Sequence, residues 1–150
     1  MNASRPDGGP ALFRLVRHWA RQWAPDVVER FAGDAPPGWT VSTLFVIQAI
    51  AGAAAEEVTV ADVAHQLGID RSVASRMVGE AVRDGFAVRS TSTRDARRAV
   101  LTLTDPAKEF LAASQAHQRQ AFEALVGHWP REDQERFAGY LSRLADEVLG

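Results

Sequence analysis

Apolar residues recur at steps of three and four along most of the chain, which is the spacing of one face of an α-helix. Near the start, this spacing predicts an amphipathic helix from Pro10 that Pro25 ends or kinks, with a turn or two beyond. Residues 40–53 are apolar on most sides and predict a buried central helix. The positions that carry the two predictions are Leu12, Leu15, Val16, Trp19 and Trp23, and then Val41, Leu44, Phe45, Ile47 and Ile50.

Two short helices joined by a tight turn come next. The first is predicted over Thr59–Leu67, where the threonine is suited to cap the helix and Asp62 suits the positive end of its dipole. Gly68 is well placed to stop this helix. The second is predicted over Asp70–Asp84, with its first aspartate as the cap.

Two strands with a basic loop between them follow these helices. Phe86–Thr91 and Ala99–Leu103 read as strands, and the loop Ser92–Arg98 makes them a hairpin with an electropositive tip. Two short helices and then a hairpin form a winged helix-turn-helix. We therefore predict a mainly α fold with a small β hairpin, in which residues 40–104 are the winged helix-turn-helix region.

Amphipathic helices are predicted on both sides of this region. Asp105 is expected to cap a long helix with Pro106 at its first position, and Pro130 is expected to end it. The last helix has one apolar stripe, made of Phe137, Leu141, Leu144 and Val148. Because the winged module does not need these helices, we expect residues 10–34 and 105–150 to bury apolar surface in a second subunit.

The length and composition narrow the class of protein. A chain of 150 residues favours a single domain over 1–150, and the polar, glycine-rich residues 1–9 predict a disordered start. The absence of cysteine excludes disulfides and thiolate metal sites and fits a reducing cytoplasm. The histidines are scattered, so no metal or other cofactor is predicted. No signal peptide or membrane span is predicted.

The distribution of charge says more than its total of −2. Residues 69–99 contain seven arginines and four acids, a net charge of +3, whereas the rest of the chain has ten bases and fifteen acids, a net charge of −5. Positive charge is thus concentrated on the second short helix and the hairpin. Duplex DNA favours such a concentration, because basic side chains release counterions from its phosphates.

The second short helix and the hairpin tip offer different contacts to DNA. Ser72 and Ser75 are small enough to approach base edges or phosphates, and Arg76 suits a guanine or a phosphate. Arg71 stands at the start of this helix, which lies near the groove in typical helix-turn-helix docking. The hairpin tip suits the minor groove, with Asp95 expected to hold the Arg97 guanidinium. The charged residues of this tip are Arg94, Asp95, Arg97 and Arg98.

At this point the sequence resembles the MarR family of bacterial transcription regulators. The stretch from Val58 to Leu111 looks like the winged core of that family. The most specific part is Asp95-Ala96-Arg97-Arg98 followed by AVLTLT, which is similar to the D-x-R wing of the family. The segment IDRSVASRMV is similar to the start of its recognition helix.

The resemblance implies a homodimeric regulator that binds double-stranded DNA. The two-fold symmetry of a homodimer predicts a pseudo-palindromic operator, and we expect the protein to act as a repressor. It implies that Ser72, Ser75 and Arg76 meet the major groove and that Arg97 meets the minor groove. It also implies a small, often aromatic effector bound between the dimerisation and DNA-binding parts. The candidate effector residues in this chain are Trp19, Phe45 and His117, although core or dimer packing is the more common role of such tryptophans.

Two other classes of function stay open from the sequence. The winged helix is also compatible with a module that binds protein rather than DNA. An enzyme is disfavoured, because the serines have no partnered base and no metal motif is present. Arginines on a helix are also common on a solvated face, so their role rests on the combination of helix and hairpin.

Overall fold

The computed structural model describes residues 7–31 and 35–150, and for residues 21–31 it describes the backbone alone. The chain divides into two units, 1–33 and 34–150. The first unit holds helix α1 (Gly8–Phe31), which starts two residues before the predicted Pro10 and continues through Pro25. Most of the predicted disordered start lies outside the described residues.

Helix α2 (Val41–Gly52) is the centre of the second unit, as predicted. Its N-terminus is closed by a capping box, in which Thr40 Oγ1 accepts from the Thr43 amide at 3.1 Å and Thr43 Oγ1 accepts from the Thr40 amide at 2.7 Å. Helices α3, α4 and α5 and strand β2 pack against α2. Its buried side chains form the core of this unit and include Leu44, Val46, Ile47 and Ile50.

Helices α3 (Val60–Leu67) and α4 (Arg71–Arg83) form the helix-turn-helix. The predicted cap of α3 is present, with the Thr59 amide donating to Asp62 Oδ2 at 2.7 Å. Gly68 ends the helix in the left-handed region, at φ 63°, which a residue with a Cβ rarely adopts. Asp70 precedes α4, but its side chain forms no capping hydrogen bond with this helix, all of which is described.

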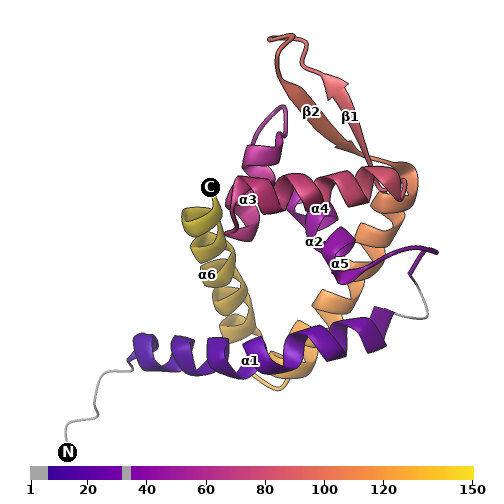
Figure 1. Ribbon diagram of the computed structural model, residues 1–150. Helices are drawn as coiled ribbons and strands as arrows, with labels where there is room; N and C mark the ends of the chain where they lie inside the picture. Colours follow the sequence, from indigo (N-terminus) through magenta and orange to yellow (C-terminus); the bar gives the residue numbers. More distant parts are fainter. Residues whose placement is uncertain (1–6, 32–34) are drawn as a thin grey trace, which may run out of the picture. The chain divides into compact units, whose positions relative to one another are not determined.

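The hairpin pairs β1 (Ala87–Thr91) with β2 (Ala99–Leu103) in antiparallel register, from Ala87↔Leu103 to Thr91↔Ala99. Figure 1 shows it extending away from the helices of its unit. A third segment joins β2 through a single bridge, in which the Leu101 amide donates to the Val58 carbonyl at 2.8 Å. This bridge, which the sequence pattern did not predict, places the loop before Val58 beside the base of the hairpin.

Helix α5 (Asp105–Val126) follows the hairpin, and its cap is Thr104 rather than the predicted Asp105. The Thr104 hydroxyl accepts from the Ala107 amide at 3.4 Å and donates to the Gly85 carbonyl at 2.7 Å. This tertiary hydrogen bond favours the threonine as the cap, since it also joins α5 to the turn after α4. On the far end, the helix stops at Val126, a little before the predicted break at Pro130.

Helix α6 (Arg131–Leu149) closes the chain. Its ring contact with α5 is made by Phe137, whose ring centroid lies 6.0 Å from that of Phe122. None of its residues, all of which are described, is buried. The predicted apolar stripe is therefore largely open to solvent within one copy of the chain. None of the described helices combines the length and apolar character that crossing a bilayer requires.

Candidate nucleic-acid interface

One side of α4 faces solvent and carries the four residues predicted from the sequence. The helical repeat of 3.6 residues places positions 71, 72, 75 and 76 on one side and positions 74, 78 and 81 on the other. The second set, all small or apolar, is buried against the core. The exposed set is Arg71, Ser72, Ser75 and Arg76.

The two arginines of this face differ in their surroundings. Arg76 forms an ion pair with Glu80 one turn later, at 3.4 Å, and its side chain stays 69% exposed. Such an exposed pair is worth only about 0–1 kcal/mol, so a phosphate or a base can replace the carboxylate. No acidic side chain of the described residues pairs with Arg71. Both guanidinium groups are thus accessible to a ligand on this face.

The hairpin loop, which we call the wing (Ser92–Arg98), is ordered by its own hydrogen bonds. The buried hydroxyl of Ser92 accepts from the amides of Arg94 at 3.0 Å and Asp95 at 3.1 Å. The Asp95 carboxylate accepts from the backbone amide of Arg97 at 2.9 Å, and not from the guanidinium group as the sequence suggested. Asp95 therefore fixes the backbone that carries Arg97 and leaves the guanidinium group to other partners.

The three arginines of the wing are exposed, and one of them is paired. Arg94 forms an ion pair with Glu56, whereas no acidic side chain in the described part of the chain pairs with Arg97 or Arg98. Arg97 and Arg98 line an open hollow of about 310 Å³ together with Arg89 of β1. Three guanidinium groups around one hollow make this side of the hairpin attractive to anions.

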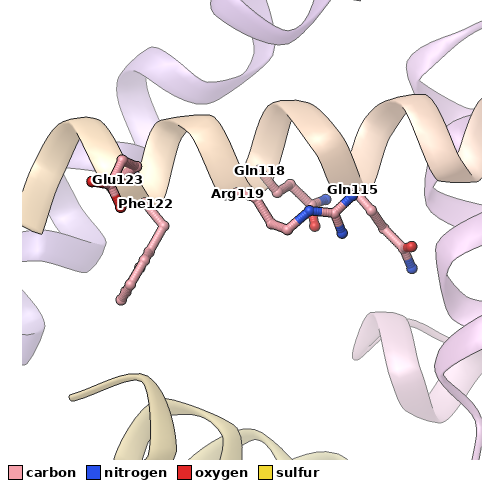
Figure 2. A pocket seen from close by; sticks show the side chains of 5 residues that line it. All are labelled: Gln115, Gln118, Arg119, Phe122 and Glu123. Carbon is pink, nitrogen blue, oxygen red and sulfur yellow. The ribbon is translucent and has the colours of Figure 1, made fainter. Parts of the chain in front are cut away.

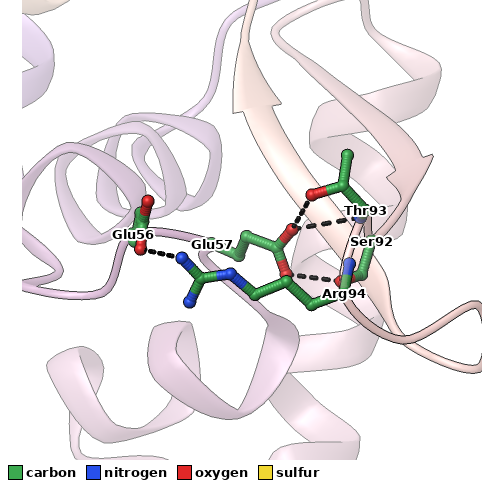
Figure 3. Close-up of polar contacts among 5 residues, drawn as sticks. All are labelled: Glu56, Glu57, Ser92, Thr93 and Arg94. Atoms are coloured by element: carbon green, nitrogen blue, oxygen red, sulfur yellow. Dashed lines mark hydrogen bonds and ion pairs between the residues drawn. The ribbon is translucent and has the colours of Figure 1, made fainter.

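Two acidic residues that sequence analysis missed lie at the base of the wing (Figure 3). Besides the Glu56–Arg94 pair, the Glu57 carboxylate accepts hydrogen bonds from Ser92 and Thr93. These bonds, that of Ser92 first, hold the pKa of Glu57 below its ordinary value of 4.5. The contacts join residues more than thirty positions apart, so no local sequence signal pointed to them.

The predicted effector residues are distributed over both units. Trp19 lies on α1, in the first unit, and is 42% exposed. In the second unit, Phe45 on α2 and His117 on α5 are both partly buried. Their helices pack against each other, with Gln48 Nε2 donating to Ser114 Oγ at 3.0 Å.

A hollow of about 470 Å³ opens along α5, and sequence analysis did not single out any residue of its lining. Figure 2 shows five side chains of this helix around it, with the Phe122 ring pointing away from the helix. The lining combines this ring with amides, a guanidinium group and a carboxylate, and consists of Gln115, Gln118, Arg119, Phe122 and Glu123. Among the described residues, no three histidine, aspartate or glutamate side chains lie together as a group that could hold a metal ion.

Comparisons with known proteins agree on one family. A model described as MarR family matches residues 38–98, the region of the helix-turn-helix and the wing. No curated protein matches the chain. The solved structure of a MarR/EmrR family transcriptional regulator from Acinetobacter sp. ADP1 is 14% identical, has a TM-score of 0.66, and the alignment covers 95% of this chain and 98% of that one.

Two further solved structures with this fold contain DNA. The S. aureus MepR–DNA complex is 19% identical with a TM-score of 0.62, and the alignment covers 93% of this chain and 98% of that one. Streptococcus pneumoniae FabT in complex with DNA is 15% identical with a TM-score of 0.65, at 91% and 96% coverage. Residues 38–98 thus match the MarR family model, and the chain shares its winged fold with these solved structures.

Proposed function

We propose that the protein is a cytoplasmic, homodimeric transcription regulator that binds duplex DNA at a pseudo-palindromic operator, as a repressor. In this proposal α4 enters the major groove and presents Ser72, Ser75 and Arg76 to base edges and phosphates. Arg71 binds phosphate at the start of the helix. The wing reaches the flanking minor groove with Arg97, and Arg94 and Arg98 add charge beside it.

The observation that carries this proposal is the shared exposure of the α4 face and the wing. On α4 the exposed positions that a groove would meet hold arginine or serine and the small or apolar positions are buried, and the wing exposes three arginines. The buried core of a protein-binding interface is typically apolar and poor in charge. The α4 face instead holds arginine and serine, which favours nucleic acid.

A homodimer is supported by the apolar residues that one copy leaves open. On α6, Leu141 and Leu144 are 41% and 44% exposed, and Val148 is 64% exposed. Exposed apolar residues that follow one helical stripe are typical of an interface. A second copy of the same helix is a suitable partner, and two-fold symmetry would place two α4 helices about one DNA turn apart.

The response to a small aromatic effector is part of the same proposal. The hollow along α5 supports it, because an aromatic ring beside a guanidinium group suits an aromatic acid. An effector can shift the conformational equilibrium of the dimer only by the difference between its binding free energies for the two conformations. Benzoate and related aromatic acids, tested for release of a bound duplex, are direct probes of this part.

The experiment that tests DNA binding is selection of duplexes from a random-sequence library, followed by fluorescence anisotropy at fixed salt. We expect one preferred, two-fold-related sequence and a wild-type complex with two copies of the chain. Arg76→Ala and Arg97→Ala should weaken it, and Arg136→Ala on α6 is the matched control that removes an equal charge elsewhere. Failure to enrich any duplex, with capture of a protein partner that is insensitive to salt, would favour the protein-binding alternative.

A further inference from the structure

The loop before Val58 brings two neighbouring carboxylates against the base of the wing, and each contacts a different part of it (Figure 3). Glu57 accepts from Ser92 Oγ at 2.5 Å and from the amide and the hydroxyl of Thr93, both at 3.1 Å. Glu56 contacts only the Arg94 guanidinium group among the described residues. We call these two carboxylates the wing anchor.

Glu57 controls the backbone of the wing through Ser92. A serine hydroxyl has one proton to donate and two lone pairs that accept. Here the proton goes to Glu57, which leaves both lone pairs to the amides of Arg94 and Asp95. Asp95 in turn accepts from the amide of Arg97 at 2.9 Å. An unbroken series of hydrogen bonds therefore runs from the Glu57 carboxylate to the backbone of Arg97.

The environment of this series makes it effective. Ser92 is 7% exposed, so water has little access to its hydroxyl. The lowered pKa of Glu57 agrees with a carboxylate that stays ionised and accepts charge-assisted bonds, which are stronger than neutral ones. The wing is thus fixed before DNA arrives, and the loss of freedom on binding is reduced.

Glu56 acts in the opposite direction on Arg94. The pair lies at the surface, with the Arg94 side chain 64% exposed and that of Glu56 76% exposed. A DNA phosphate that approaches the wing has to displace Glu56 before it gains the full charge of Arg94. Glu56 also places a negative charge beside a surface that binds a polyanion, so it opposes association.

We propose that the wing anchor sets the DNA affinity of this protein through two opposed contacts: Glu57 presents Arg97 to the minor groove, and Glu56 withholds Arg94 from the phosphates. The proposal rests on the proposed DNA-binding function. It assigns Glu57 as a positioning residue and Glu56 as a competitor of DNA.

The Glu57 part is tested first without DNA, by amide hydrogen exchange of the wild type, Glu57→Ala and Glu57→Gln. We expect Glu57→Ala to speed exchange at Thr93, Arg94, Asp95 and Arg97 while amides of α2 stay protected. The exchange rates of Glu57→Gln should lie between those of the wild type and Glu57→Ala, because the amide oxygen of glutamine still accepts a hydrogen bond. Exchange of the wing amides at the wild-type rate in Glu57→Ala overturns this part.

The DNA readout separates positioning from a general loss of stability. On the duplex selected from the random library, Glu57→Ala should bind about three- to tenfold more weakly, because the wing backbone that carries Arg97 then has to be ordered on binding. In an Arg97→Ala background the same substitution should have little further effect, since it acts through Arg97. If Glu57→Ala lowers DNA affinity equally with and without Arg97→Ala, its role is merely structural and the assignment of Glu57 as a positioning residue is overturned.

For Glu56 the expected sign is reversed. Glu56→Gln should tighten binding about two- to fivefold per wing, the range of an exposed ion pair. It should also steepen the plot of log K against log salt by about 0.9 per wing, as Arg94 gains a phosphate. Glu135→Gln is the matched control, because Glu135 forms an exposed pair with Arg131 on α6 at 2.8 Å and has the same charge.

The outcomes distinguish the wing anchor from the proposed function. If Glu56→Gln binds DNA with wild-type affinity, or if Glu135→Gln gains as much affinity as Glu56→Gln, the Glu56 part is overturned. If the wild type binds no duplex of the library, the proposed function fails and the Glu56 part falls with it. The exchange measurement still decides whether Glu57 orders the wing.

Discussion

The salt dependence of DNA binding can be worked out from the ion pairs of the structure. Seven arginines lie between residues 69 and 99. Three of them already have an acidic partner, since Arg76 pairs with Glu80, Arg83 with Asp84, and Arg94 with Glu56. In the described part of the chain, no such partner is present for the remaining four, which are Arg71, Arg89, Arg97 and Arg98.

These four arginines set the expected slope. Each phosphate that an arginine neutralises contributes about −0.9 to the slope of log K against log salt. Four such contacts per subunit give a slope of about −7 for a dimer, a fifth in which Arg76 exchanges Glu80 for a phosphate gives about −9, and all seven would give about −13. Arg97→Ala should make the slope shallower by about 2 for the dimer and weaken binding by about 1–3 kcal/mol per contact.

The assay is fluorescence anisotropy of the selected duplex at several salt concentrations, with sedimentation velocity to confirm that Arg97→Ala stays dimeric. Arg136→Ala again serves as the control for loss of one positive charge outside the interface. A slope near −13 would show that the acidic partners give up their arginines freely. An Arg97→Ala protein with the wild-type slope and affinity would refute the wing contact.

Three further predictions concern α4, α6 and the wing. Arg76→Ala should relax base preference if the guanidinium group contacts a base, and it should weaken binding equally on all duplexes if the group binds a phosphate. Unchanged affinity for every duplex of a competition series would contradict both contacts. Removing residues 133–150 should give monomers or aggregates in sedimentation, and a well-behaved dimer would argue against an interface through α6. Below pH 4.5 the NMR resonance of the Thr93 amide should move as Glu57 takes up a proton. The hydrogen bonds of the ionised carboxylate are fully present above its ordinary pKa of 4.5, and they are lost as the pH falls through the lowered pKa of the folded protein. A Thr93 resonance that does not move over this range would mean that Glu57 does not hold the wing.

The parts of the fold that sequence analysis predicted depend on neighbouring residues. The α3 cap joins Thr59 and Asp62, three positions apart, and the stop at Gly68 needs only a left-handed residue. The exposed face of α4 follows from helical spacing alone, which is why the four contact candidates could be placed before the structure was known. Local patterns of this kind specify elements and faces.

Of the predictions that were wrong, one involves a partner distant in the sequence and another involves a choice between two groups of the same neighbouring residue. Thr104 caps α5 because its hydroxyl also reaches the Gly85 carbonyl, nineteen positions away. Asp95 accepts from the backbone amide of Arg97, two positions away, in a wing that is folded around Ser92. The local pattern gives no sign of the first contact, and it brings Asp95 and Arg97 together without deciding between the backbone amide and the guanidinium group.

A count of charges is limited for the same reason. The net charge of +3 over residues 69–99 predicts an electropositive region. It does not include Glu56, which lies outside that window and yet pairs with Arg94 inside it. The free positive charge is concentrated at the start of α4 and on the wing, the two places that a helix in one groove and a loop in the next would touch. How firmly each place binds DNA is therefore decided by its carboxylate neighbours as much as by its arginines.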